Sequence, residues 1–211
     1  MRKQMGAVLA EESGVPSDVV VPVPDSGVPA AIGYAQAAGV PFELGIIRNH
    51  YVGRTFIEPE QKIRALGVKL KHSANPGVIR GARIILIDDS LVRGKTSKKI
   101  VGMLKEAGAR GVHMRISSPP IRYPDFYGID TPRTTELLAA NNTIEEMRAY
   151  LEADTLAFLS VDGLYRAMGH DRRDPHQPQF TDHCFTGDYP TRLTDQHGTH
   201  HRQLSLLAEA S

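Results

Sequence analysis

The stretch RIILIDDSLVRGKTS, Arg83 to Ser97, decides the fold class of this chain. It begins with a run of strand length that is apolar in its middle, as is typical of a buried parallel strand. Two aspartates, Asp88 and Asp89, follow this run, and a helical apolar face begins soon after Ser97. A buried strand that leads through a polar loop into a helix is the repeating unit of a parallel sheet flanked by helices.

The same alternation continues along most of the chain. We expect further strands at 19–23, 41–47, 112–116 and 155–160, and helices at 1–14, 28–39, 97–109, 143–151 and 161–169. The 143–151 helix opens with a capping box, Thr143 to Glu146. The fold class is therefore α/β, with a mostly parallel sheet. Ligands of such sheets bind at the carboxyl ends of the strands, so the loops after Val23, Ile47, Asp88 and Ile116 are expected to converge on one crevice.

Composition excludes several classes of protein. Lys and Arg number 25 and Asp and Glu 24, so a net charge of +1 argues against a nucleic-acid partner. The single cysteine, Cys184, allows no internal disulfide and favours a reducing compartment. No apolar run is long enough to span a membrane, and the first residues do not form a signal peptide. We expect a cytoplasmic protein with no membrane partner.

The chain divides into a main domain, 1–168, and a C-terminal extension, 169–211. The extension holds six of the nine histidines and few apolar residues, so we expect it to be irregular and partly disordered. Within the main domain, 48–82 lacks clean periodicity and is rich in Lys and Arg. Such a long unpatterned stretch is typical of a functional lid, and we expect a short helix within it at 58–67.

The loop after Asp88 predicts a ligand that carries a phosphate and hydroxyl groups. The start of the following helix and the donors from Arg93 to Ser97 suit one phosphate. Two carboxylates are badly placed for that phosphate, but they accept hydrogen bonds from hydroxyls and ligate Mg²⁺. The combination describes a ribose 5-phosphate. The simpler alternative is that Asp88 ends the strand and that Asp89 or Ser90 caps the helix.

These residues resemble the loop that binds phosphoribosyl pyrophosphate (PRPP) in phosphoribosyltransferases. The resemblance extends to VPVPDSGVPAAIGYA, ELGIIRNHYVGRTFIEP, RISSPPIRYPDFYGID, DTLAFLSVDGL and CFTGDYPT. Together these segments are similar to the glutamine-PRPP amidotransferases, which catalyse the first step of purine synthesis. The similarity runs from about Met5 to Met168 and returns at Cys184 to Thr191. It implies the type I phosphoribosyltransferase fold.

The resemblance also implies a role for each matching residue. PRPP is expected to contact Asp25, Ser26, Asp88, Asp89, Ser90, Val92, Arg93, Gly94, Lys95, Thr96 and Ser97. Mg²⁺ is expected at Ser26, Asp88 and Asp89. The catalytic contacts from the lid, which closes over PRPP, are expected from Arg48, Tyr51 and Arg54. By this resemblance the chain forms 5-phosphoribosylamine and pyrophosphate from PRPP and ammonia.

Two features of the family have no counterpart here. The sequence lacks the N-terminal glutaminase half that releases ammonia from glutamine, so we expect the chain to use ammonia directly. Some members hold an iron–sulfur cluster through cysteines, but Asp125 and Thr181 stand where those cysteines would be. Cys184 alone cannot hold a cluster that needs about four ligands, so none is expected. The family further implies a homo-oligomer and purine nucleotides as feedback inhibitors.

Other readings of the sequence remain open at this point. A PRPP-binding regulatory protein, or a phosphoribosyltransferase that acts on a nucleobase, could share the same loop. A P-loop nucleoside triphosphatase is the weakest alternative, because Asp89 stands where that motif requires a glycine. The histidine tract at His197 to His201 could bind a metal, but a solvated tail explains it more simply. His72 and His113 are expected to be ordinary strand or loop residues.

Overall fold

The computed structural model describes residues 1–49, 72–129, 131 and 133–193. The helices are α1 (Arg2–Ser13), α2 (Val28–Ala38), α4 (Pro76–Ile79), α5 (Lys95–Glu106), α6 (Leu138–Asn141), α7 (Ile144–Leu151), α8 (Val161–Ala167) and α9 (His183–Thr186), with a 3-10 helix, η2, at Thr134–Glu136. The strands are β1 (Val19–Pro22), β2 (Ile46–Arg48), β3 (His72–Ala74), β4 (Arg83–Asp88), β5 (Gly111–Ile116) and β6 (Thr155–Phe158).

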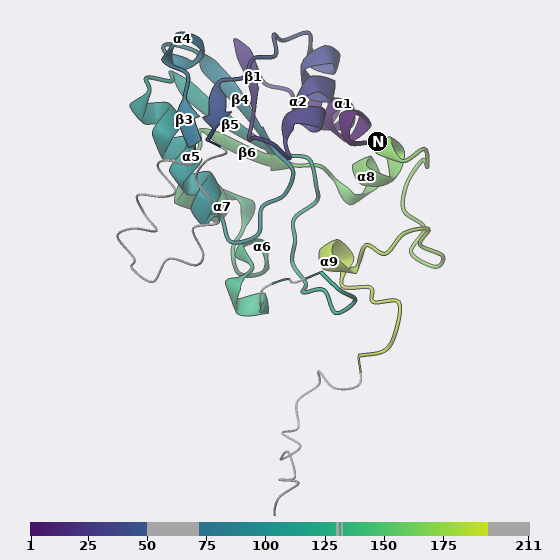
Figure 1. Ribbon diagram of the computed structural model, residues 1–211. Coiled ribbons are helices and arrows are strands. Elements are labelled where there is room, and N and C mark those ends of the chain that lie inside the picture. The colour runs from purple at the N-terminus through teal and green to yellow at the C-terminus, as the bar shows by residue number, and fades with distance from the viewer. Residues whose placement is uncertain (50–71, 130, 132, 194–211) are drawn as a thin grey trace, which may run out of the picture.

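The main sheet has four strands in the order β1-β4-β5-β6, and all its pairings are parallel. The predicted strand Arg83 to Asp88 lies inside this sheet between β1 and β5, as its apolar middle requires. Helices cover both faces: α1, α2 and α8 lie on one side, and α5 and α7 lie on the other (Figure 1). The predicted α/β class with a mostly parallel sheet is confirmed.

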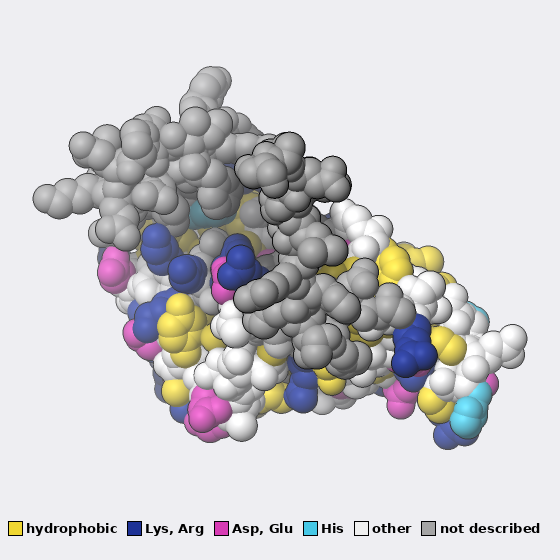
Figure 2. All heavy atoms as spheres, turned by 90° about the horizontal axis from the view of Figure 1, so that it is seen from below, with side chains coloured by type: hydrophobic (Ala, Val, Ile, Leu, Met, Phe, Trp, Pro, Cys, Tyr) yellow, Lys and Arg dark blue, Asp and Glu magenta, His cyan; other side chains and the backbone are white. Residues whose placement is uncertain are grey.

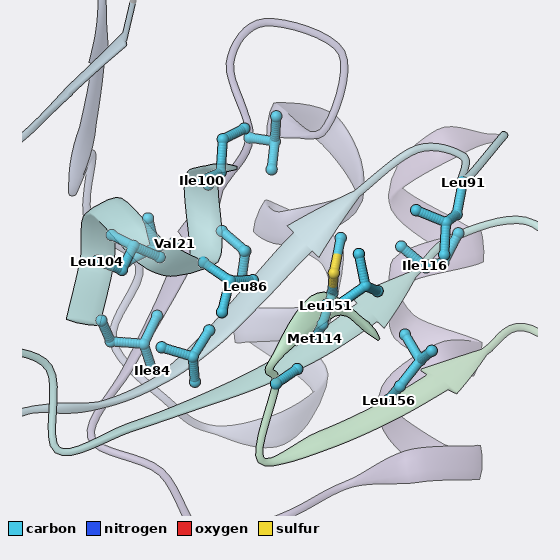
Figure 3. Packing of buried hydrophobic residues seen from close by; sticks show 14 of the residues in the cluster. Val21, Ile84, Leu86, Leu91, Ile100, Leu104, Met114, Ile116, Leu151 and Leu156 are labelled. Carbon is cyan, nitrogen blue, oxygen red and sulfur yellow. The ribbon is translucent and has the colours of Figure 1, made fainter. Parts of the chain in front are cut away.

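Alternate residues of each strand supply the two cores, because successive side chains of a strand point to opposite faces. Ile84 and Leu86 of β4 pack with Ile100 and Leu104 of α5, and these side chains point toward one another across one face (Figure 3). Ile85 and Ile87 pack on the opposite face with α1 and α2. All four β4 side chains are fully buried, so this strand fixes the helical layers relative to each other.

The predicted strand at 41–47 is wrong in its place and pairing. Phe42 makes only an isolated parallel bridge with Val20, and the chain then leaves the sheet. The regular strand here is β2, which pairs antiparallel with β3 in a separate two-stranded sheet. Gly45 lies at the departure point, where an added Cβ would be 2.7 Å from Ile79 Cδ1 and 2.9 Å from Val21 Cγ2. The chain therefore turns against the core at this glycine.

The first part of the extension has little regular structure, but polar contacts hold it to the rest of the chain. Residues 170–193 contain α9, and two of their polar side chains, Asp182 and His183, are buried. Arg173 binds Asp182 with an N–O distance of 2.5 Å, and the hydroxyl of Tyr165 donates to the same carboxylate. Polar pairs hold this segment, which a count of apolar residues does not reveal. Residues 194–211, with the histidine tract, lie outside the described part of the chain.

The helices offer no membrane-spanning candidate. Among the residues that the structure describes, none forms a helix of the length and apolar character that crossing a bilayer requires.

Candidate active site

The loop after β1 is pressed against the end of β4. The backbone N–H of Val23 donates to the carbonyl of Ile87 at 2.7 Å, and the N–H of Gly27 donates back to the carbonyl of Val23. The peptide bond between Pro24 and Asp25 is cis. A Cβ on Gly27 would lie 2.5 Å from the Ile87 carbonyl oxygen, so only glycine permits this approach. The loop is thereby held beside the carboxyl end of β4.

Asp88 is the last residue of β4 and is only 8% exposed. Burial and the neighbouring Asp89 carboxylate raise the pKa of Asp88 to about 7. One oxygen of Asp88 accepts the backbone N–H of Asp89 at 2.9 Å. The carbonyl of Asp88 accepts the backbone N–H of Ser117 at 2.9 Å and is 3.2 Å from its hydroxyl. The β5 end therefore positions the Asp88–Asp89 peptide.

The loop between Asp88 and α5 is supported from below by the η2–α6 segment. The N–H of Leu138 donates to the Val92 carbonyl at 2.8 Å, and Arg93 forms an ion pair with Glu136 at 2.8 Å. Gly94 has a φ of 71°, and an added Cβ would be 2.8 Å from the Leu138 side chain. This left-handed glycine turns the chain directly into α5, whose first backbone N–H groups are unpaired within the helix.

These loops meet at a cavity of about 540 Å³. Its lining residues in the described part of the chain are Arg2, Val23, Pro24, Asp25, Ser26, Arg48, His72, Asp88 and Thr96. Arg48, at the end of β2, forms an ion pair with Asp25. Lys and Arg side chains gather on the face seen from below the molecule, although the net charge is only +1 (Figure 2). One predicted residue of each kind thus lines this cavity, Thr96 for the phosphate, Asp88 for the sugar and Arg48 for the lid. Asp89 and the predicted residues from Ser90 to Lys95 are not among its lining residues.

The prediction of the crevice is confirmed for three of its four loops. Residues after Val23, Ile47 and Asp88 line the cavity, whereas none of the described lining residues comes from the loop after Ile116. Ser97 is buried at 5% exposure and faces the core from α5. Tyr51 and Arg54, like the helix predicted at 58–67, lie outside the described residues. The sequence reading missed Arg2 and His72, which carry no motif and are distant in sequence from the loops they join.

A larger cavity of about 880 Å³ lies along α5, between β3 and the end of α7. Its lining is mainly apolar, and it takes Lys95 and Thr96 from the predicted phosphate loop but neither aspartate. Thr96 and His72 line both cavities. We assign the active site to the smaller cavity, because it brings together the carboxylates, the cation and the helix start that the chemistry needs.

The donor set of the smaller cavity fits a magnesium ion. Asp88 lines it beside the hydroxyl-bearing Ser26, and Asp89 follows directly in the chain. Oxygen ligands of this kind are those that Mg²⁺ prefers. The raised pKa of Asp88 agrees with this, since its buried carboxyl beside the half-buried Asp89 lacks a counter-charge that a cation would supply.

A second group of metal-ligand types lies at the extension, where Asp125, His183 and Cys184 offer ligand atoms within 4.8 Å of one another. His183 Nε2 lies 2.6 Å from Asp125 Oδ1, and both side chains are buried. The other Asp125 oxygen accepts the N–H groups of Tyr127 and Ile129. Asp125 and His183 therefore pair through Nε2 and hold α9 to the loop after β5, while His183 Nδ1 is buried without a hydrogen-bond partner among the described residues. Burial and the Asp125 charge raise the pKa of the Cys184 thiol, which disfavours the thiolate that binds metals.

Comparison with known proteins agrees with this geometry. The model of the phosphoribosyl transferase domain family matches residues 9–117, the stretch that contains the cavity residues that follow Val23, Ile47 and Asp88. The chain belongs to this family. The predicted type I phosphoribosyltransferase fold is thereby confirmed.

The chain is also highly identical to several amidophosphoribosyltransferases. It is 65% identical to the amidophosphoribosyltransferase of Rhizobium etli over 98% of this chain and 42% of that protein. It is 55% identical to the Bacillus subtilis enzyme of the same name over 91% of this chain and 40% of that protein. The solved structure of the B. subtilis glutamine PRPP amidotransferase, complexed with ADP and GMP, matches with a TM-score of 0.83 and 53% identity over 92% of this chain and 43% of that one. The chain thus spans about two fifths of the length of these relatives.

Proposed function

We propose that this chain is an amidophosphoribosyltransferase that joins ammonia to C1 of PRPP and releases pyrophosphate. The observation that carries the proposal is the cavity lined by Asp25, Arg48, Asp88 and Thr96, which come from the loop after β1, the ends of β2 and β4, and the start of α5. The relatives named amidophosphoribosyltransferase support the same assignment. The reaction would be the first step of purine biosynthesis.

The 5-phosphate binds at the start of α5. The loop from Ser90 to Ser97 presents backbone N–H groups and hydroxyls there, and the positive end of a 12-residue helix favours an anion. Gly94 allows close approach of the backbone. The buried Ser97 shapes the turn from the core side, while Thr96 faces the cavity.

Asp88 and Asp89 accept hydrogen bonds from the ribose hydroxyls, and the pyrophosphate binds at Pro24 to Gly27. Mg²⁺ would be held by Ser26, Asp88 and Asp89, and it would supply positive charge to neutralise the pyrophosphate as it leaves. Arg48 lies beside Asp25 and adds a cation to the same end of the site. Tyr51 and Arg54 are proposed to complete the lid.

The reaction needs no protein nucleophile. The bond between C1 and the pyrophosphate oxygen breaks with its electron pair leaving on pyrophosphate, and the positive charge that develops is shared by C1 and the ring oxygen. Ammonia gives its lone pair to C1, and the ammonium product then loses one proton to solvent or pyrophosphate. The protein contributes positioning, charge stabilisation and exclusion of water, which would otherwise hydrolyse PRPP.

The remaining properties follow from the same family assignment. The nitrogen donor is ammonia, which comes from glutamine where a glutaminase domain is present. Purine nucleotides are proposed as feedback inhibitors, because the B. subtilis relative was solved with ADP and GMP. We also propose a cytoplasmic homo-oligomer without an iron–sulfur cluster.

Pyrophosphate release from PRPP, measured with four acceptors, tests the proposal. Wild-type chain with Mg²⁺ should release pyrophosphate with ammonia and much less with glutamine, with a purine or pyrimidine base, or with water alone. Preference for a base would make the chain a nucleobase phosphoribosyltransferase. PRPP binding without turnover, together with sequence-specific DNA binding in a gel shift, would favour the regulatory protein.

A further inference from the structure

One wall of the active-site cavity comes from the N-terminal helix. Arg2, in the first turn of α1, lines the cavity together with Asp25 and Ser26. Its side chain makes no ion pair or hydrogen bond with the residues that the structure describes. The other arginine of the lining, Arg48, is already bound to Asp25. Arg2 is therefore the lining arginine whose guanidinium is available to a ligand.

The backbone that carries Arg2 is firmly placed. An added Cβ on Gly33 of α2 would lie 1.8 Å from the Lys3 carbonyl oxygen, and one on Gly6 would lie 1.9 Å from the Ala30 carbonyl oxygen. The two helices thus touch backbone to backbone at Lys3 and Gly6. Leu9, one turn further along α1, is fully buried against the sheet. Ligand binding by Arg2 therefore needs no ordering of this backbone, and only the rotamer freedom of the side chain is lost.

Arg2 shares the cavity chiefly with residues of the loop after β1. Four of the nine lining residues belong to Val23–Ser26, whereas the start of α5 contributes only Thr96. If the proposed function holds, the first of these loops faces the pyrophosphate. That group brings several negative charges into a cavity that already contains the carboxylates of Asp25 and Asp88. Cations beyond Arg48 and one Mg²⁺ are needed to balance them.

We propose that Arg2 binds the diphosphate group of the substrate, as a second arginine beside Arg48. The planar guanidinium offers paired N–H donors that match two phosphate oxygens, which a lysine does not. Arg2 then holds the leaving group in the ground state and stabilises its charge as the bond to C1 breaks. This inference rests on the proposed function, since it names a further substrate contact of the same site.

Calorimetric titration of the full chain in the presence of Mg²⁺ tests it, with PRPP, pyrophosphate and ribose 5-phosphate as separate ligands. Arg2→Gln should bind pyrophosphate and PRPP at least tenfold more weakly than wild type and bind ribose 5-phosphate within twofold of it. The affinity of Arg2→Lys for pyrophosphate and PRPP should lie between those of wild type and Arg2→Gln, because lysine keeps the charge but lacks the paired donors. Lys3→Gln, the exposed neighbour that does not line the cavity, should match wild type.

The outcomes separate this inference from the function it rests on. If wild type binds PRPP and Arg2→Gln binds pyrophosphate equally well, Arg2 is not a substrate contact although the function stands. An equal loss for ribose 5-phosphate would mean a general disturbance of the site and would also overturn the inference. If wild type itself binds no PRPP, both the function and the role of Arg2 are wrong.

Discussion

The Arg48 guanidinium and the Asp25 carboxylate form an ion pair that joins the end of β2 to the loop after β1. The two residues are 23 positions apart in the chain, and both line the cavity. Without substrate, the pair keeps a cation in the cavity and neutralises one of its carboxylates. A bound pyrophosphate would meet Arg48 already in place.

Replacement of Arg48 should therefore weaken PRPP binding. We expect Arg48→Gln to raise the KM for PRPP and the dissociation constant by about 10- to 100-fold, since a charge-assisted contact to phosphate contributes ~1.5–3 kcal/mol. Steady-state kinetics and titration calorimetry measure both quantities.

Arg83→Gln provides the matched control. Arg83 forms an ion pair with Asp18 at 2.7 Å, also partly exposed, but at the opposite end of β4. This variant should leave PRPP binding unchanged. Equal effects of the two substitutions would contradict a specific role for Arg48.

The folding stability of the ligand-free protein should depend on pH through the titration of Asp88. Because the folded pKa is raised to about 7, the folded chain keeps a proton between about pH 4 and 7 that the unfolded chain loses. Stability therefore falls as pH rises through this range, by up to about 4 kcal/mol for three pKa units. An asparagine at this position cannot ionise. The stability of Asp88→Asn relative to wild type should therefore increase from pH 5 to pH 8.

Urea unfolding without Mg²⁺ at these two pH values measures the difference. Asp171→Asn, at an exposed position in the extension, should behave as wild type at both. A gap between Asp88→Asn and wild type that is the same at pH 5 and pH 8 would show that Asp88 does not titrate as proposed.

The loop after β1 should depend on Gly27. A methyl group there would lie 2.5 Å from the Ile87 carbonyl, so Gly27→Ala must push the loop away from β4. We expect at least a tenfold loss of PRPP affinity. Gly102→Ala, in α5 with no atom within 4 Å of the added Cβ, should keep full affinity and gain ~0.5–1 kcal/mol of helix stability. Affinities and urea midpoints distinguish the two, and full affinity in Gly27→Ala would refute the close approach.

The Asp125–His183 pair should hold the extension to the domain. Hydrogen bonds from Ile129 and Tyr127 and the pairing with His183 lower the pKa of Asp125 against its burial. The stabilisation by ionised Asp125 is therefore fully present above about pH 4, the pKa of an aspartate in the unfolded chain. It is lost as the pH falls further, through the lower pKa of the folded state. Asp125→Asn should lower the urea midpoint at pH 6. The midpoint of this variant should also fall less than that of wild type as the pH is lowered.

A double-mutant cycle with His183→Gln tests whether the two residues act as a pair. We expect the double variant to be destabilised by clearly less than the sum of the single variants, and limited proteolysis should cut all three faster within 170–193. Additive effects would mean that the contact contributes no coupling.

Local patterns in the sequence predicted the strands and helices of the sheet well. They predicted poorly the features that depend on contacts between residues distant in sequence. The run from Arg83 to Asp88 and the capping box at Thr143 both form as predicted, because burial of an apolar strand and a helix cap are local properties. The prediction of a strand at 41–47 was wrong, because the local pattern resembles that of a sheet strand. The chain leaves the sheet at Gly45 because of contacts with Ile79 and Val21, which are distant in sequence.

The same distinction applies to the site. Asp88, Asp25 and Thr96 belong to motifs and were found from the sequence, and the structure brings them to one cavity. Arg2 gave no signal, because an arginine in the first turn of a helix is common and only the α1–α2 crossing carries it to the cavity. His183 appeared among the tail histidines, and its buried partner, Asp125, is 58 residues away.

The central claim is that the cavity between the loop after β1 and the start of α5 binds PRPP with magnesium. Calorimetric titration of the wild-type chain and of Asp89→Asn with PRPP, with and without Mg²⁺, tests it most directly. We predict saturable binding of one PRPP per chain that requires Mg²⁺ and is at least tenfold weaker in Asp89→Asn. Absence of PRPP binding by the wild-type chain, or binding that neither Mg²⁺ nor Asp89 affects, would contradict the account.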